Sequence, residues 1–259
     1  MWRAEAISPS GGVRQGAQLE VQSESMANLS SVFDRTGALQ RPSLSRLMSE
    51  YRAVFADRPI QPARETLPSG GGAVVLVIPG FLIDDNVLAP FRRYLDSLDF
   101  RAFGWGYGRN WGPTEGALNH LRRRVGELTD LNGGPIAVVG ISLGGLFARD
   151  LAHDCPGLVR HVVTLASPVR LPTASSFEIL IRALSPFYSD RLEVSRLASP
   201  LPVPSTAFFT TDDGVVAWES CRSDDPGCTN IEVTGPHMTI CGNPAVLSQL
   251  VSILAESVE

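Results

Sequence analysis

The sequence Gly-Ile-Ser-Leu-Gly-Gly at residues 140–145 decides the fold class of this chain. It follows an apolar run at residues 136–139, which is typical of a buried strand, and it precedes residues 146–153, which favour a helix. The glycines around Ser142 permit a tight turn where a side chain would collide with neighbouring backbone. The stretch therefore predicts a strand, a sharp turn and a helix, with Ser142 exposed at the turn. A glycine-rich turn of a nucleotide-binding unit is the alternative interpretation.

Similar short apolar runs recur along the chain. They lie at residues 73–78, 100–105, 136–139, 161–165, 206–210 and 230–233. Between them, apolar residues recur at the three- and four-residue spacing of amphipathic helices, and a closing helix is expected from Pro244 to about residue 255. Because strand and helix alternate, we expect an α/β fold with a mostly parallel central sheet and helices on both faces. Ligands are then expected at the carboxyl ends of the strands.

The chain has 259 residues, 44% of them hydrophobic, which suits one large α/β domain, or at most a domain with a short appendage; we favour one domain. We place the main domain at residues 73–259 and an N-terminal extension at residues 1–72. Within the extension, polar composition predicts a disordered tail over residues 1–27, and apolar spacing predicts a helix within residues 29–55. Residues 171–204 interrupt the alternation with an apolar helical patch framed by prolines. We interpret this insert as a lid over the strand ends; an ordinary long crossover is the alternative.

The charge distribution argues against a nucleic-acid partner. The net charge is −5, and the only dense basic cluster is the arginine run at residues 122–124. No stretch approaches the ~20 apolar residues that span a bilayer, and residues 1–27 lack the apolar core of a signal peptide. We therefore expect no transmembrane segment and a cytoplasmic location. The sequence makes no prediction of oligomeric state.

Cysteine and histidine spacing gives little support for a metal site. Cys155, Cys221, Cys228 and Cys241 are too scattered for a disulfide scaffold, and no pair has zinc-finger spacing. We expect reduced thiols, with a short loop closed by Cys221 and Cys228 as the alternative. No metal and no cofactor are predicted.

The chemistry expected of Ser142 requires a base. A serine hydroxyl is a poor nucleophile until a histidine accepts its proton, and the histidine needs an orienting carboxylate. His120, His153 and His161 fall in predicted helices or a predicted strand. His237 lies in a loop between the last predicted strand and the closing helix, from which the chain can reach back to Ser142. His237 is therefore the candidate base.

The orienting carboxylate is expected in the loop after the strand predicted at residues 206–210. Asp212 and Asp213 are both available there. We favour Asp213, because Gly214 beside it permits a turn that would aim the carboxylate; Asp212 is the alternative, and a solvated turn residue is the interpretation without function.

A tetrahedral intermediate on Ser142 would need backbone N–H donors for its oxyanion. The residue after the nucleophile, Leu143, supplies one. The other is expected from the loop after the first strand of the main domain, where Gly80 allows a sharp turn. Phe81 is the favoured second donor and Leu82 the alternative.

Taken together, these features resemble the α/β-hydrolase superfamily, and within it the bacterial lipases and esterases. The likeness covers about residues 73–257, and residues 1–72 have no counterpart. The family commonly has His-Gly at the oxyanion loop, where this chain has Pro79 and Gly80. The motifs that carry the resemblance are Pro-Gly-Phe at 79–81, residues 140–145, Val-Val-Thr-Leu-Ala-Ser-Pro at 162–168, Asp-Gly-Val-Val at 213–216 and Gly-Pro-His at 235–237.

The resemblance implies hydrolysis of carboxylic esters through an acyl-enzyme, without a cofactor. Ser142 would attack, His237 would shuttle the proton and Asp213 would orient the histidine. A serine in place of an aspartate argues against dehalogenase or epoxide-hydrolase chemistry. Acyl transfer by the same residues and a non-catalytic binding protein are the alternative functions.

Apolar and aromatic residues near the expected site suggest a small-molecule hydrophobic ester or acyl substrate. The loop at residues 105–111 is aromatic and follows a predicted strand, so Trp105 and Tyr107 are candidate lining residues. The other candidate lining residues are Leu82, in the loop after the first strand of the main domain, and Phe187, in the insert. Ordinary packing is the alternative for the two loop aromatics.

Overall fold

The computed structural model describes residues 42–56, 66–170, 175–189 and 194–257. These residues all belong to one compact unit, Ala38–Glu259. The tail predicted at residues 1–27 and the start of the predicted N-terminal helix lie outside the described residues, as do parts of the insert. The described part of that helix is α2 (Leu44–Ala56).

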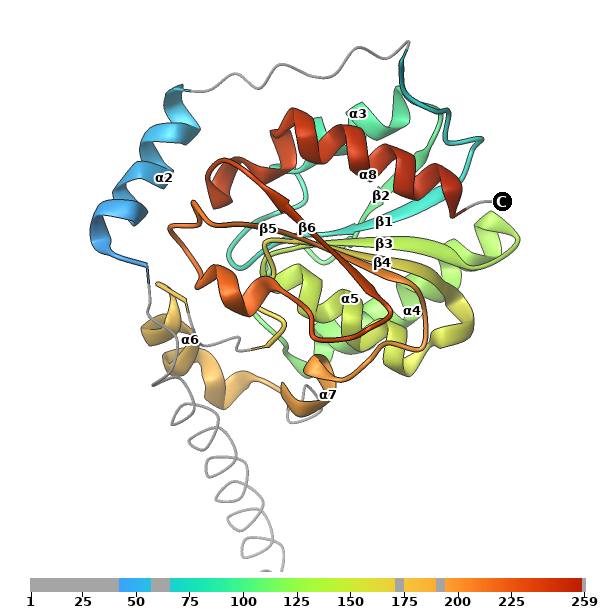
Figure 1. Cartoon of the computed structure of the whole chain (residues 1–259). Helices are drawn as coiled ribbons and strands as arrows, with labels where there is room; N and C mark the ends of the chain where they lie inside the picture. Colours follow the sequence, from blue (N-terminus) through green and yellow to red (C-terminus); the bar gives the residue numbers. More distant parts are fainter. Residues whose placement is uncertain (1–41, 57–65, 171–174, 190–193, 258–259) are drawn as a thin grey trace, which may run out of the picture. The chain divides into compact units, whose positions relative to one another are not determined.

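One sheet of six strands organises the described residues, in the order β2-β1-β3-β4-β5-β6, and every neighbouring pair is parallel (Figure 1). Each strand predicted from the sequence forms within two residues of its predicted ends. The strands are β1 (Val74–Ile78), β2 (Arg101–Gly104), β3 (Ile136–Ile141), β4 (Val159–Leu165), β5 (Ser205–Thr210) and β6 (Cys228–Val233).

Helices cover both faces of the sheet, as the alternating sequence predicts. Helices α3 (Ala89–Asp96) and α8 (Pro244–Glu256) pack on one face, and α4 (Glu115–Asn132) and α5 (Leu143–Asp154) pack on the other (Figure 1). Side chains of β1 alternate between the two layers, with Val75 and Val77 in the first and Val74, Leu76 and Ile78 in the second. All five are fully buried, which explains the unbroken apolar run in the sequence.

The described parts of the insert between β4 and β5 contain three short helical segments. They are α6 (Glu178–Leu184), η4 (Ser185–Phe187) and α7 (Val194–Ala198). Before α6, Ser175 forms an isolated antiparallel bridge with Val216, which lies after β5. The insert is thereby tied to the carboxyl edge of the sheet; its role as a lid stays a prediction.

Three further short helices complete the described structure: η3 (Pro156–Leu158), η5 (Trp218–Cys221) and η6 (His237–Gly242). All four cysteines are free thiols. Among the described residues, no helix is both long and apolar enough to cross a bilayer.

Candidate active site

Ser142 occupies the turn between β3 and α5, in a backbone conformation that few residues other than glycine adopt. Its φ is 51° and its ψ is −121°. The turn is held by two backbone hydrogen bonds: the Ser142 N–H donates to the Leu165 carbonyl at 2.8 Å, and the Ser142 carbonyl accepts from Gly145 N–H at 3.0 Å. A non-glycine residue held at positive φ is strained, and such strain is common at functional sites.

The glycines around Ser142 are required by close packing of backbone on backbone. A Cβ on Gly140 would collide with the backbone of Gly144 and Gly145. A Cβ on Gly144 would collide with the carbonyl groups of Ile78 and Pro79. The start of α5 therefore lies directly against the end of β1, and this places Ser142 beside the loop that follows β1.

Asp213, in the loop after β5, is buried, and both of its carboxylate oxygens have hydrogen-bond partners. Its side chain is 1% exposed. Oδ1 accepts hydrogen bonds from the backbone N–H groups of Val215 and Val216, both at 2.8 Å. Oδ2 lies 2.7 Å from Nδ1 of His237, at the start of η6 after β6. One oxygen thus fixes the carboxylate and the other fixes the imidazole.

The neighbouring aspartate has a different partner. Asp212 is exposed, and its Oδ2 accepts a hydrogen bond from Gly235 N–H at 2.9 Å. The structure therefore brings Asp213, and not Asp212, against His237.

Gly214 is also constrained by packing. Its φ is not positive, so the turn does not use the left-handed conformation that glycine favours. Instead, a Cβ at Gly214 would come within 2.5 Å of the Arg46 carbonyl oxygen and 2.8 Å of Glu50 Cγ. The glycine makes room for α2.

The electrostatic environment of His237 favours the protonated imidazole. Burial is the largest influence and by itself would lower the pKa, because the side chain is only 5% exposed. The charge and hydrogen bond of Asp213, together with the charge of Glu50, outweigh burial and raise the pKa above its ordinary value of 6.5. An imidazole in this setting is a stronger base than a free one.

The loop after β1 passes beside the serine. A Cβ on Gly80 would lie 3.2 Å from the Cβ of Ser142. The Leu82 N–H already donates to the Asn110 carbonyl at 2.7 Å, whereas within the described residues no acceptor pairs with the Phe81 N–H. Leu143 is the first residue of α5, where backbone N–H groups have no intrahelical acceptor. Phe81 and Leu143 are therefore better placed than Leu82 to bind an anion.

Asn110 fixes this loop and was missed by the sequence analysis. The side chain is fully buried, and its Nδ2 donates to the Pro79 carbonyl at 2.8 Å. Its backbone N–H donates to the Ile83 carbonyl at 3.0 Å. Because these contacts join loops about 30 residues apart, no local pattern identifies them.

The aromatic residues proposed to line the site are distributed differently. Trp105 is fully buried in the core, where its ring stacks on Phe147 with a centroid distance of 6.2 Å and its Nε1 donates to the Gly108 carbonyl at 2.8 Å. Tyr107 is 44% exposed and packs edge-on against Trp105. These contacts favour packing, the alternative interpretation, for Trp105.

The insert reaches the loop beside the serine through a residue that we did not predict. Phe177 packs edge-on against Phe81 at a centroid distance of 6.1 Å, and it also packs on a buried cluster that includes Val215 and Val216. Phe187, the predicted residue, lies farther along the insert and is 72% exposed. The insert thus contacts both the loop after β1 and the loop after β5.

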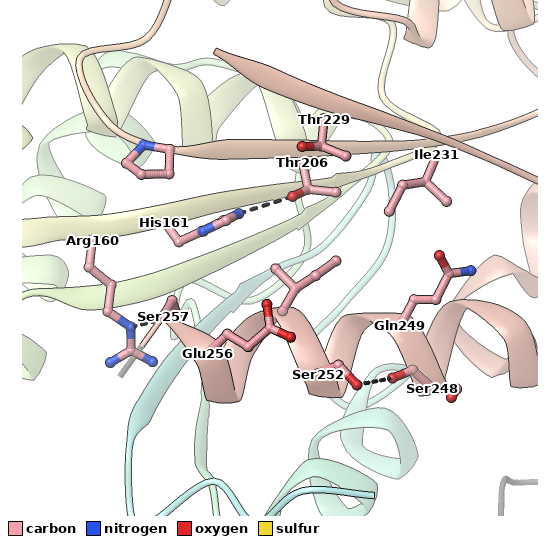
Figure 2. A pocket seen from close by; sticks show the side chains of 12 residues that line it. Arg160, His161, Thr206, Thr229, Ile231, Ser248, Gln249, Ser252, Glu256 and Ser257 are labelled. Carbon is pink, nitrogen blue, oxygen red and sulfur yellow. Dashed lines mark hydrogen bonds between the residues drawn. The ribbon is translucent and has the colours of Figure 1, made fainter. Parts of the chain in front are cut away.

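A cavity of about 610 Å³ lies at the other end of the strands from Ser142, near the amino-terminal ends of β4 and β5 (Figure 2). Arg160, His161 and Thr206 line it from the amino-terminal parts of β4 and β5, and His161 Nε2 lies 3.0 Å from Thr206 Oγ1. It includes no candidate catalytic residue, so we do not assign it to the same site. Among the described residues, no group of His, Cys, Asp or Glu side chains is arranged to hold a metal ion.

Comparison with known proteins identifies the fold. No family model and no curated protein matches the chain. A monoacylglycerol lipase from Paleococcus ferrophilus matches with a TM-score of 0.53 and 15% identity, over 74% of this chain and 97% of that one. A mature Bacillus licheniformis lipase gives 0.54 and 14%, over 73% and 94%. The thioesterase domain from the curacin biosynthetic pathway gives 0.50 and 15%, over 71% and 92%.

The chain has the α/β-hydrolase fold. The fold class predicted from the sequence is confirmed, and so is its resemblance to lipases and esterases of this fold. In this fold, Ser142, Asp213 and His237 all follow the carboxyl ends of strands, where ligands of open α/β sheets bind.

The N-terminal extension adds one side chain to the loops around these residues, and sequence reasoning missed it. Glu50 of α2 accepts hydrogen bonds from backbone N–H groups of the loop after β5, which we call the acid loop, and of the segment after β6, which we call the histidine loop. A signal was present: Glu50 lies three residues after Leu47 and four before Val54, on the apolar face of the helix. An acidic residue in such a stripe indicates a buried carboxylate with partners elsewhere.

Proposed function

We propose that this chain is a serine hydrolase that cleaves carboxylic esters through an acyl-enzyme on Ser142. His237 is the general base, Asp213 orients it, and the N–H groups of Phe81 and Leu143 form the oxyanion hole. The observation that carries the proposal is the buried Asp213–His237 pair, 2.7 Å apart, at the sheet edge where Ser142 occupies its strained turn. The lipases and esterases among structures of the same fold support it.

The reaction follows from the roles of these groups. Ser142 Oγ attacks the ester carbonyl carbon while Nε2 of His237 accepts the hydroxyl proton. The tetrahedral oxyanion is stabilised by the two N–H donors, and by the N-terminus of α5 behind Ser142. Collapse expels the alcohol, which takes the proton from His237. Water, deprotonated by His237, then cleaves the acyl-enzyme, releases the acid and restores Ser142.

The substrate class follows from the insert. Ile179, Leu180 and Phe187 are apolar, and they are 80%, 39% and 72% exposed. Exposed apolar side chains that gather on one short segment are typical of a surface that binds an apolar ligand. We propose that the insert is a lid that covers a hydrophobic acyl group. Each buried CH₂ would contribute about 0.8 kcal/mol to binding.

A fluorophosphonate probe and a panel of p-nitrophenyl esters of graded acyl length test the proposal. The wild type should be labelled once, at Ser142, and Ser142→Ala should lose labelling and several orders of magnitude in kcat. Ser97→Ala is the matched control, since this exposed serine at the end of α3 lies at the other edge of the sheet. Ester cleavage by Ser142→Ala at the wild-type rate would disprove the mechanism.

Acyl transfer uses the same residues and is separated from hydrolysis by its products. Adding a competing alcohol, amine or thiol should leave the free acid as the main product. A dominant transfer product would reassign the chain as an acyltransferase. Thioesters belong in the panel, because one structure of the same fold is a thioesterase domain.

A further inference from the structure

Glu50 brings a buried negative charge to the two loops that carry the proposed acid and base. Its side chain is 1% exposed. Oε1 accepts hydrogen bonds from the backbone N–H groups of Gly214, at 2.7 Å, and His237, at 2.9 Å. Oε2 accepts from the N–H of Met238 at 2.8 Å. We call these three contacts the Glu50 clamp. They link Gly214, which follows Asp213, to His237.

The clamp requires a carboxylate rather than an amide. Three backbone donors converge on two oxygens, and both oxygens of a carboxylate accept. A glutamine offers one accepting oxygen and turns an NH₂ group toward at least one of these N–H donors, which would then be buried without a partner. Within the described residues, Glu50 makes no ion pair, so backbone N–H groups are its direct partners. Charge-assisted hydrogen bonds of this kind are about twice as strong as neutral ones.

Helix α2 holds the acid loop at a second point. The guanidinium of Arg46, one turn before Glu50, donates to the Thr211 carbonyl at 3.2 Å. The helix lies so close that a Cβ at Gly214 would collide with it. The approach of α2 to this loop therefore involves backbone packing as well as the buried carboxylate.

We propose that Glu50 is a positioning residue, which locks the acid loop to the histidine loop so that His237 stays aligned on Asp213 and Ser142. On this proposal α2, which precedes the main domain and has no counterpart in the family resemblance, is part of the active site. The inference rests on the proposed function and goes beyond it.

The charge of Glu50 also acts on His237. Two charged groups face the imidazole in the described structure: Asp213 from the acid loop and Glu50 from α2. Against the lowering effect of burial, both raise the pKa of His237. On the neighbouring η5 and η6, burial raises the pKa of the Cys221 thiol and raises that of Cys241 to about 12, so both thiols are neutral at neutral pH. Removing the Glu50 charge should therefore lower the pKa of His237.

Glu50→Gln is the decisive variant, with a short-chain p-nitrophenyl ester as substrate. We expect kcat/KM to fall about 10- to 100-fold, because displacement of catalytic groups by about 1 Å has effects of this size. The midpoint of the acidic limb of the kcat/KM profile should move to lower pH, by up to about one unit. The rate of fluorophosphonate labelling of Ser142 should fall by a similar factor.

Two controls isolate the buried charge. Arg52→Gln changes the charge of the same helix by one unit at an exposed position, and it should leave rate and midpoint unchanged. Glu50→Asp keeps the charge but shortens the reach, so it should recover most of the pH midpoint while the rate stays reduced. If Glu50→Gln does not fold, Gly214→Ala replaces it, since the added Cβ displaces α2 without altering a charged group; the same downward shift is expected.

The outcomes separate this proposal from the proposed function. A reduced rate or melting temperature with an unmoved pH midpoint would make Glu50 merely structural and overturn the positioning role. Wild-type rate and midpoint in Glu50→Gln would overturn it as well. In either case, inactivity and loss of labelling in Ser142→Ala would leave the serine mechanism standing. Full activity of Ser142→Ala would instead refute the proposed function.

Discussion

One carboxylate oxygen of Asp213 binds backbone N–H groups and the other binds the imidazole of His237. The effect of replacing this carboxylate can therefore be predicted. Asp213→Asn presents an NH₂ group to either Val215 and Val216 or to His237, so the imidazole loses its orienting acceptor or the loop loses its anchor. We expect kcat to fall by about 10⁴. Asp212→Asn is the control, with near wild-type kcat expected. Steady-state kinetics on one ester decide, and the opposite ranking would move the acid to Asp212.

On the proposed mechanism, the raised pKa of His237 should set the pH dependence of activity. Catalysis needs the neutral imidazole, so the protonated fraction is inactive. Because the pKa is raised above 6.5, the acidic limb of kcat/KM should have its midpoint above 6.5, and activity should rise through that midpoint as pH increases. A pH profile of kcat/KM with a non-ionising ester measures it. A midpoint well below 6.5 would mean that burial outweighs Asp213 and Glu50.

Individual residues differ in how far the sequence could identify them. Ser142 stands in a local motif, and His237 was predicted from chain order and its place between two predicted elements. Asn110 was missed because its partner lies 31 positions away; the place of Glu50 on an apolar face indicates burial, but its partners, up to 188 positions away, leave no local pattern. Trp105 was assigned to the site from its loop, but packing against Phe147 depends on tertiary contacts that no local pattern reports.

At the scale of elements, the insert is the segment whose secondary structure is hardest to predict from the sequence. The apolar patch that suggested one helical segment is divided, since α6 ends at Leu184 and a short 3₁₀ turn with Pro186 follows. A proline lacks the N–H that would continue the helix. By contrast, all six strands were predicted, most readily β1, β3 and β5, each of which is buried along its whole length.

The insert should govern acyl-chain preference rather than bond cleavage. Phe187 is apolar, largely exposed and without proton-transfer chemistry. Phe187→Ala should lower kcat/KM for long acyl esters about tenfold more than for acetate, since one aromatic side chain buries an area worth roughly 1.5–3 kcal/mol. The ester panel measures the ratio. Leu131→Ala, an exposed position on α4, is the control. Equal losses on both esters would mean that the insert is structural.

At the scale of the whole molecule, the stability of the fold should depend on pH through His161, which lines the cavity in Figure 2. Burial, followed by the charge of Arg160, lowers the pKa of His161 to about 4. In the unfolded chain the pKa of histidine is ~6.5. Between these values the unfolded chain binds a proton that the folded chain does not, so His161 destabilises the fold progressively as pH falls through this window.

His161→Gln removes this proton uptake. The variant should lose less melting temperature than the wild type between pH 7 and pH 5, while above the unfolded-state pKa the pH dependence of the two proteins should be the same. Thermal unfolding followed by circular dichroism measures both. Parallel melting curves across the whole range would show that His161 does not contribute to acid sensitivity.

The residues that form the Glu50 clamp are also synthesised at different times. Glu50 and His237 are 187 positions apart. At about 5–20 residues per second, roughly 10 to 40 s pass between their synthesis. During that time the partners of the carboxylate at His237 and Met238 have not yet been made. Translation that stops after residue 233 therefore yields a polypeptide with its nucleophile but without its base or its clamp, and such incomplete copies should be inert toward esters.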